Sequence, residues 1–455
     1  MYQQIYKNIL FPLYETGFRG RNTLKYLNNL EDSQWYSRED LRSIQWEKLL
    51  KLLKNAYENV PFYNSMLKKI DLNPEDIKSI GDFQKIPYLT KNDIQTNGNA
   101  LVAVNYRNNN TCNNETGGST GEPINFVYPR ESYEWRIAGA LRSNRWTGWD
   151  LGKRTTLIWG RSIDKKSLLG NLKVRLHHFF MRRQYINAFY LSESRMEGVI
   201  EEIIRFQPEF LESYVSPLYA MAEYLSKSKI SRIKPKAIIT SAENLYDYQR
   251  ELIEAVFGCK VFNRYGCSET MLIAAECDRH EGMHLNMDNV YIEFLKDNKP
   301  VKAGEMGEIV ITDLNNYGMP FVRYKIGDIG VPSSRICSCG RGLPLMEKVE
   351  GRAMDIMFTK EGNFIQPQLF CFLFKEFDWI KQYQIIQDER GMLAFKVIPK
   401  CIVTELDKER FSIRIKQVIT GTVTVRLDLV KEIPLTRSGK FQMVISKTPV
   451  NFGNS

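Results

Sequence analysis

Hydrophobic positions in the first part of the chain recur at the spacing of a helix. Five of them share one face of residues 46–57: Trp46, Leu49, Leu50, Leu53 and Tyr57. The pattern predicts an amphipathic helix there, followed shortly afterwards by Pro61. No internal repeat or low-complexity tract interrupts the chain.

From about residue 130 the hydrophobic pattern alternates between two periods. Short runs rich in β-branched residues predict strands at 155–159, 237–240, 260–262 and 308–312. Helical periodicity lies between them, at 196–206, 217–227 and 246–256. This alternation predicts α/β layers around a mostly parallel sheet.

The pattern changes near residue 350. Four elements are predicted beyond it: hairpin-like runs at 382–387 and 393–398, a polar amphipathic helix at about 404–419, and a strand at 423–429. The predicted fold class is therefore α/β in two parts. Layered α/β subdomains form a large N-terminal domain, 1–351, and residues 352–455 form a small α+β domain.

Composition places the chain among ordinary globular proteins. Of its 455 residues 43% are hydrophobic and 25% charged, which argues against disorder, collagen or a coiled coil. The formal charge is +10, which favours anionic partners such as nucleotides, coenzyme A or acidic membranes. No zinc-finger, helix-turn-helix or RNA-recognition pattern supports nucleic-acid binding.

The termini and cysteines indicate the compartment. The N-terminus lacks the pattern of a signal peptide, and apolar runs such as 370–374 are far shorter than the ~20 residues that span a bilayer. The eight cysteines do not resemble a disulfide framework. We expect a reduced, cytoplasmic, soluble protein.

Two motifs suggest phosphate and nucleotide chemistry. Residues 116–123 (Thr-Gly-Gly-Ser-Thr-Gly-Glu-Pro) form a hydroxyl- and glycine-rich loop whose N–H groups can surround phosphate oxygens, although it is not a Walker A loop. Residues 263–269 (Asn-Arg-Tyr-Gly-Cys-Ser-Glu) follow a predicted strand, where α/β proteins bind ligands. Each alone is weak, because flexible loops and Tyr-Gly turns are common.

Three further motifs are also weak when taken singly. Residues 323–328 place Asp328 after a glycine turn, where a carboxylate can accept two ribose hydroxyls. Residues 350–355 lie at the proposed domain boundary. Residues 434–440 end in Ser-Gly-Lys440, whose cation can reach a developing negative charge or simply be solvated.

Together, the order and spacing of the five motifs resemble the adenylate-forming superfamily of acyl-CoA synthetases, luciferases and adenylation domains. Residues 54–63 (Lys-Asn-Ala-Tyr-Glu-Asn-Val-Pro-Phe-Tyr) and 86–91 (Ile-Pro-Tyr-Leu-Thr-Lys) resemble its phenylacetate–CoA ligase-like branch. Within that branch the chain is most similar to members of capsular polysaccharide biosynthesis. The resemblance spans nearly the whole chain.

The resemblance implies an AMP-forming ligase that uses ATP and Mg²⁺. A carboxylate attacks the α-phosphate of ATP to give an acyl-adenylate and pyrophosphate. The small domain then rotates, and an acceptor takes the acyl group. CoA suits the branch, whereas a sugar amine or hydroxyl suits the polysaccharide members.

The resemblance also implies roles for individual residues. It implies that Ser119, Thr120 and Gly121 contact the β- and γ-phosphates of ATP. The adenine and acyl pocket is implied for Ser241, Ala242, Glu243, Asn263, Tyr265, Gly266 and Ser268, with Asn263 at the adenine edge and Tyr265 stacked on the ring. Glu269 is the implied Mg²⁺ ligand, Asp328 with Arg352 holds the ribose, and Lys440 bridges carboxylate and α-phosphate.

Two positions depart from the family pattern. Ser268 stands where threonine is more usual, and at the hinge Met354 occupies the aspartate position while Asp355 comes one residue later. The altered hinge leaves the second half-reaction open. It also keeps an alternative in view, a catalytically silent relative that binds nucleotide or acts as a scaffold in polysaccharide assembly.

A second constellation has the ligand types of a structural zinc site. Cys277 and His284 follow the third predicted strand, and Cys337 and Cys339 form a Cys-x-Cys pair further on. His280 is the competing imidazole, and unrelated thiols in loops are the plain alternative. The phenylacetate–CoA ligase-like branch has similar Cys/His elements, which favours zinc.

A basic stretch, 153–183, carries nine Lys or Arg against a single acid, Asp164, beside leucines and phenylalanines at helical spacing. The preferred interpretation of this stretch is a packed helix with a solvated cationic face. One alternative is peripheral contact with an anionic membrane, and the other is a binding site for an anionic acceptor. The acyl substrate and oligomeric state do not follow from the sequence, although Tyr214, Tyr219, Cys267 and Met271 suggest a mixed pocket.

Overall fold

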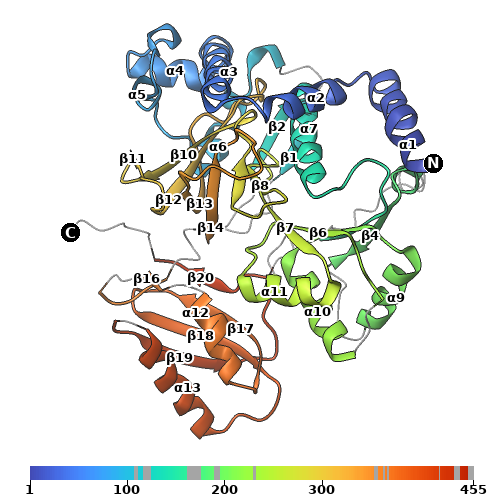
Figure 1. Ribbon diagram of the computed structural model, residues 1–455. Helices are drawn as coiled ribbons and strands as arrows, with labels where there is room; N and C mark the ends of the chain where they lie inside the picture. The colour runs from blue at the N-terminus through green and yellow to red at the C-terminus, as the bar shows by residue number, and fades with distance from the viewer. Residues whose placement is uncertain are drawn as a thin grey trace.

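The computed structural model describes residues 1–106, 111–115, 124–160, 176–188, 195–228, 232–352, 357–361, 364–365, 368–419, 421–434 and 441–448. Figure 1 shows a large N-terminal part, which carries helices and a long curved sheet, above a smaller C-terminal part. Among the described residues, no helix is long and apolar enough to cross a membrane.

A 12-stranded sheet organises the large part. Its strands, in spatial order, are β11 (Lys299–Pro300), β10 (Val290–Lys296), β12 (Gly307–Asp313), β13 (Tyr324–Pro332), β14 (Leu345–Arg352), β9 (Met283–Leu285), β8 (Ala274–Glu276), β7 (Lys260–Tyr265), β6 (Ala237–Ser241), β5 (Phe210–Ser213), β3 (Thr155–Trp159) and β4 (Arg183–Asn187). The sheet changes character at β7. From β7 to β4 neighbours run parallel, whereas from β8 to β11 they run antiparallel.

The expectation of a mostly parallel sheet is therefore wrong, because the antiparallel part of the sheet is the larger one. The parallel strands are joined by helices, as parallel pairing requires, and these helices carry the clear 3.6-residue period. The antiparallel strands are joined by turns and loops that contain no helix, so no helical pattern separates them in the sequence. Strand β10 is one that the hydrophobic pattern did not single out.

The helices of the large part have clear local signals. They are α1 (Tyr2–Ile5), α2 (Thr23–Ser33), α3 (Arg38–Asn59), α4 (Pro61–Lys69), α5 (Ile80–Phe83), α6 (Lys91–Asn97), α7 (Arg130–Trp146), α9 (Met196–Phe206), α10 (Val215–Ser228) and α11 (Asp247–Phe257), with π-helical turns η1 (Tyr6–Leu10) and η2 (Leu13–Phe18). Ser37 caps α3 by accepting from the Asp40 N–H at 3.1 Å. Gly258, at φ 69°, ends α11. The helix expected within 46–57 is part of α3, which is longer at both ends.

Short elements complete the large part. The 3₁₀ turns are η3 (Pro74–Asp76), η4 (Gly98–Leu101) and η5 (Val104–Tyr106), and β1 (Thr111–Glu115) pairs antiparallel with β2 (Asn125–Pro129). The main core packs α3 and α4 against β10, β12 and β13. A second core packs α9, α10 and α11 against the parallel strands.

The C-terminal part has its own sheet and core. Its four strands lie in the order β19 (Thr424–Leu429), β18 (Met392–Pro399), β17 (Ile380–Gln387) and β20 (Val444–Ser446). Helices α12 (Gln368–Leu373) and α13 (Glu405–Val418), the turn η9 (Phe374–Glu376), and the pair β15 (Met357–Phe358) and β16 (Phe364–Ile365) accompany them. Aromatic side chains dominate this core, with Phe374, Phe395 and Phe411 in mutual contact. The predicted hairpin, helix and strand are all present.

Candidate functional site

A cavity of about 1160 Å³ lies between the large and small parts of the chain. Six residues of the predicted nucleotide site line it: Ala242, Glu243, Asn263, Tyr265, Gly266 and Asp328. The small part contributes Ile380–Tyr383, Lys400 and Phe441–Val444 to the lining. Ser241, Ser268 and Glu269 do not line the cavity, but each adjoins the lining segments in the chain.

The strand arrangement explains why these motifs meet. Strand β6 ends at Ser241 and β7 ends at Tyr265, and the two strands are parallel neighbours. The loops that follow them therefore leave from the same edge of the sheet, the usual place for ligands in α/β folds. At Gly266 an added Cβ would lie 1.9 Å from the Met271 carbonyl oxygen, so only glycine fits this turn.

Two tyrosines tie two motifs together reciprocally. Tyr265, in the 263–269 motif, donates its hydroxyl to Asp328 at 2.7 Å. Tyr324, in the 323–328 motif, donates its hydroxyl to Glu269 at 3.0 Å. Three strands separate β7 from β13 in the sheet order, so the sheet curls back on itself to bring the motifs together. Each tyrosine thus orients the carboxylate of the other motif.

The Tyr324–Glu269 pair is buried. Tyr324 is fully enclosed and Glu269 is 5% exposed. Burial, together with the nearby Glu269 carboxylate, raises the pKa of Tyr324 well above its usual range. The hydroxyl therefore stays protonated and donates to the carboxylate throughout the physiological range.

Other predicted residues have defined partners. Glu243 accepts from the Ser216 backbone N–H at 2.6 Å and from its hydroxyl at 2.7 Å, which fixes the end of the 241–243 segment. The Asn263 backbone N–H donates to Glu276 at 2.8 Å. Asp328 and Arg352 are directly opposite in the β13–β14 ladder.

Several predicted residues fall outside the described part of the chain. These are Ser119, Thr120, Gly121, Lys440 and the hinge residues Met354 and Asp355, together with the side chain of Arg352. The residue after Lys440, Phe441, lines the cavity together with Asn263, Tyr265 and Asp328.

The predicted metal ligands converge at a second place. One ligand atom from each of Cys277, His284, Cys337 and Cys339 lies within 4.8 Å of all the others. The Cys277 and Cys337 sulfurs are 3.6 Å apart, and the Cys339 sulfur is 3.3 Å from His284 Nε2. In a tetrahedron with Zn–S bonds of about 2.3 Å the sulfurs would be about 3.8 Å apart, so the set fits zinc.

The surroundings of His284 suit a metal ligand. Its Nδ1 lies 3.1 Å from the Leu343 carbonyl oxygen, which leaves Nε2 facing the thiols. Burial lowers the pKa of His284 to about 4, so the ring is neutral at physiological pH. His280, the competing imidazole, lies outside the group: its Nδ1 is 3.4 Å from Glu276 and its ring packs on Phe262.

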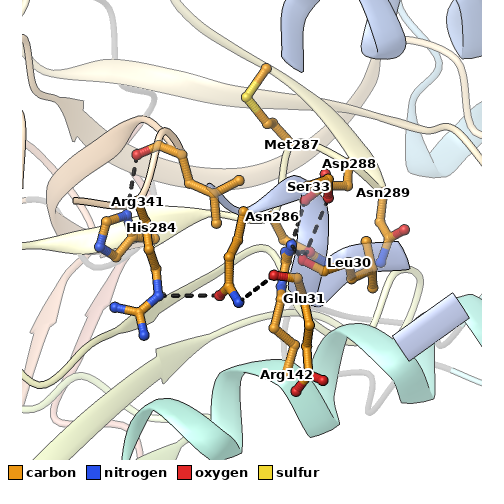
Figure 2. A network of polar contacts seen from close by, with 12 residues as sticks. Leu30, Glu31, Ser33, Arg142, His284, Asn286, Met287, Asp288, Asn289 and Arg341 are labelled. Carbon is orange, nitrogen blue, oxygen red and sulfur yellow. Dashed lines mark hydrogen bonds and ion pairs between the residues drawn. The ribbon is translucent and has the colours of Figure 1, made fainter. Parts of the chain in front are cut away.

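A buried polar network anchors the segment that follows His284, as Figure 2 shows. Arg142 of α7 donates to Asp288 at 2.6 Å, to Asn286 at 2.7 Å and to the Leu30 carbonyl at 3.1 Å. Ser33 donates to the other Asp288 oxygen at 2.8 Å. Loss of one partner of such a buried ion pair typically costs about 3–5 kcal/mol.

Sequence reasoning missed this network and both tyrosine–carboxylate contacts. Arg142 and Asp288 are far apart in the chain and belong to no motif, so no spacing could have paired them. Tyr324 lies inside a motif that was identified, but its partner Glu269 lies in another motif, so no sign of their contact was visible in the sequence. The Arg264–Glu212 ion pair beside the cavity was likewise not foreseen.

Comparison with known proteins gives consistent relatives. Residues 357–447 match the family model described as the CapK C-terminal domain. Over 437 residues, the chain is 24% identical to a phenylacetate-coenzyme A ligase of Thermus thermophilus, covering 90% of this chain and 97% of the relative. It is also 24% identical to the protein CapK of Staphylococcus aureus, with 90% and 89% covered.

Solved structures agree on the fold. A 2-hydroxyisobutyryl-CoA ligase in its postadenylation state, bound to an acyl-AMP, superposes with a TM-score of 0.71 at 20% identity, covering 91% of both chains. The same enzyme in its thioesterification state gives 0.60 at 21% identity, again with 91% of both chains covered. An o-succinylbenzoate CoA synthetase from Bacillus subtilis, with ATP and magnesium, gives 0.51 at 14% identity, covering 73% of this chain and 68% of that one.

Proposed function

We infer that this chain, a homologue of the phenylacetate–CoA ligases and of CapK with the fold of the adenylate-forming superfamily, is an AMP-forming acid–thiol ligase. The family resemblance, the fold class and the enzyme class expected from the sequence agree with these relatives. The observation that carries the proposal is a cavity lined by residues of three predicted segments, 241–243, 263–269 and 323–328, and bordered by the segment that begins at Phe441.

In the first half-reaction, a carboxylate oxygen of the substrate attacks the α-phosphorus of ATP. The bond between that phosphorus and the oxygen bridging to the β-phosphorus breaks, and pyrophosphate leaves. Catalysis of this kind depends on positioning and on stabilising charge. The cavity geometry supports Asp328 as the ribose acceptor, with Tyr265 and Asn263 beside the adenine.

Further roles follow from the same assignment. We assign Glu269 to Mg²⁺, Ser119, Thr120 and Gly121 to the β- and γ-phosphates, and Lys440 to the α-phosphate. Arg352, opposite Asp328, belongs with the ribose. Ser241, Ala242, Glu243, Gly266 and Ser268 shape the walls.

Coenzyme A is the proposed acceptor in the second half-reaction. Both the named CoA ligases among the relatives and the net charge of +10 support it. The higher TM-score to the postadenylation state supports a domain arrangement that belongs to the first half-reaction. A sugar amine or hydroxyl in surface polysaccharide synthesis is the alternative acceptor, supported by the CapK relative and by the match of residues 357–447 to the CapK C-terminal domain.

The test is carboxylate-dependent pyrophosphate release with hydroxylamine as the trap, because hydroxylamine intercepts an acyl-adenylate whatever the natural acceptor is. Aryl, aliphatic, hydroxy and amino acids form the panel. We expect saturable release with one class, and we expect Lys440→Ala to lose release while ATP binding, measured by calorimetry, largely survives. Wild-type release in Lys440→Ala removes that assignment, and absence of ATP binding in the wild type favours the scaffold alternative.

Tyr324→Phe is expected to raise the Mg²⁺ concentration needed for half-maximal pyrophosphate release by roughly 10–100-fold, as loss of an outer-shell partner does at metal sites. The hydroxyl that orients Glu269 is removed while the ring and its packing stay. Tyr63→Phe is the matched control, because Tyr63 is equally buried but donates to the Pro320 carbonyl, away from the cavity. An unchanged Mg²⁺ requirement in Tyr324→Phe contradicts the role.

A further inference from the structure

The N-terminal helical segment, residues 2–18, carries apolar side chains on both its inner and its outer side. Tyr6, Phe11 and Glu15 face the interior and are buried. The outer side carries Ile5, Ile9, Leu13 and Phe18, which are 38%, 57%, 65% and 82% exposed. A helix at the surface of a globular protein normally turns polar residues outward, so this outer face calls for an explanation.

The helix geometry aligns the outer residues. They are spaced four, four and five positions apart, and η1 and η2 are π-helical turns, in which hydrogen bonds run from residue i to i+5. The wider turn brings residues four and five apart onto one face. The buried residues follow the same spacing on the opposite side.

A second apolar segment lies against this helix. Residues 176–180 are helical, and Leu176, Phe179 and Phe180 are 48%, 74% and 49% exposed. The Tyr2 hydroxyl donates to the Phe180 carbonyl at 2.6 Å, and the Tyr14 and His177 rings are 6.2 Å apart. The packed helix expected for the basic stretch is wrong for these three side chains, and 161–175 lie outside the described residues.

Together these side chains form one surface, here named the N-terminal apolar surface: Ile5, Ile9, Leu13, Phe18, Leu176, Phe179 and Phe180. Contiguous apolar surface of this kind marks an interaction site. Figure 1 shows the helix at one edge of the molecule, on the far side from the C-terminal part.

The charged residues beside the N-terminal apolar surface indicate the kind of partner that it binds. Arg19 is exposed directly after the helix, whereas Arg182 and Arg183, which follow the second segment, are half-buried, and Arg182 lies over the Tyr2 ring. The carboxylate of the helix, Glu15, is buried and paired with Arg21 at 3.0 Å, and nearby Asp150 is paired with Lys7. The surface thus combines apolar side chains with an exposed cation, Arg19, and no free carboxylate of its own segments. An anionic lipid surface matches both features, whereas a second copy of the chain offers no negative charge to Arg19 from this surface.

We propose that the N-terminal apolar surface docks the protein on a membrane rich in anionic phospholipid. The aliphatic and aromatic side chains enter the boundary between headgroups and acyl chains, and Arg19 contacts the headgroups. Because the cavity lies between the large and small parts, at a distance from this helix, docking leaves it open to soluble substrates.

The test is flotation of the full chain with two kinds of vesicle, pure phosphatidylcholine and an equimolar mixture with phosphatidylglycerol. Wild type is expected to float with the mixed vesicles, and less so at high salt, because salt screens the exposed cation Arg19. Phe18→Ser combined with Phe179→Ser is expected to lose binding by at least roughly tenfold, since each exposed ring would leave the apolar phase. Ile402→Ser combined with Leu406→Ser, on the C-terminal part, is the matched control and retains binding; these residues are 93% and 73% exposed.

Either of two results overturns the proposal. One is wild-type protein that stays unbound to the mixed vesicles at low salt. The other is vesicle binding by the Phe18/Phe179 variant equal to that of wild type. Sedimentation velocity tests whether a second copy of the chain occupies the surface. A concentration-dependent dimer that the same double variant abolishes, in a protein that does not bind lipid, assigns the surface to that second copy instead.

Discussion

Glu269→Gln is expected to lower carboxylate-dependent pyrophosphate release by roughly 10²–10³-fold, the loss typical when a preorganised electrostatic contact to a reacting group is removed. Glutamine has nearly the same shape and still accepts the Tyr324 hydroxyl, which is 3.0 Å from Glu269 in the wild type. The negative charge is what disappears, and with it the strong ligand for Mg²⁺. We therefore expect the loss to be partly recovered at high Mg²⁺ concentration.

The control for this prediction is Glu308→Gln. Glu308 is a carboxylate of β12 that pairs with Lys325 at 2.8 Å, and it does not line the cavity. Glu308→Gln removes an ion pair between β12 and β13, the strand that carries Asp328. We expect pyrophosphate release to stay within about twofold of wild type, since partly exposed ion pairs contribute little to stability. Wild-type release by Glu269→Gln at low Mg²⁺, with Glu308→Gln unchanged, contradicts the assignment of Glu269.

The order of the helices and the parallel strands could be predicted because each has a local pattern. Helix α9 begins and ends where its periodicity does, and β3 coincides with its β-branched run. The antiparallel half of the sheet could not be foreseen in the same way. Strand β13 pairs with β14 at Asp328 and Arg352, and that pairing depends on the course of the whole chain rather than on a nearby signal.

The candidate site shows the same division. Motifs such as 263–269 are contiguous, so their residue types were visible in the sequence. The contacts between motifs were not, because the Tyr265–Asp328 and Tyr324–Glu269 hydrogen bonds join segments more than 50 residues apart. The outer face of residues 2–18 was missed for another reason: its apolar residues follow the spacing of π-helical turns rather than that of an α-helix.

The four-residue Cys/His site lies between the two motifs that carry Tyr265 and Asp328. Its loss has the largest expected effect on stability. Cys277 and His284 lie after β8 and within β9, while Cys337 and Cys339 lie between β13 and β14. Strands β14, β9 and β8 are the ones that separate β13 from β7 in the sheet. A metal at this site would therefore clamp the strands between Asp328 and Tyr265. With four protein ligands it leaves no open position, which makes its role structural.

Cys277→Ser is expected to purify without stoichiometric zinc, as measured by elemental analysis, and to unfold at lower denaturant concentration than wild type. A 100-fold loss of bound-metal affinity alone removes about 2.7 kcal/mol of stabilisation when zinc is near saturation. Cys401→Ser, which changes an exposed thiol of the C-terminal part, is the matched control and is expected to keep both zinc and stability.

The zinc prediction also separates a structural role from a catalytic one. Because a metal at this site would clamp the strands that lie between Asp328 and Tyr265, Cys277→Ser that remains folded is expected to bind ATP more weakly while the rate at saturating ATP changes less. A metal that acted on the substrate would do the reverse and lower the saturated rate. Wild-type protein without zinc, or Cys277→Ser as stable as Cys401→Ser, would show that the four side chains gather for packing alone.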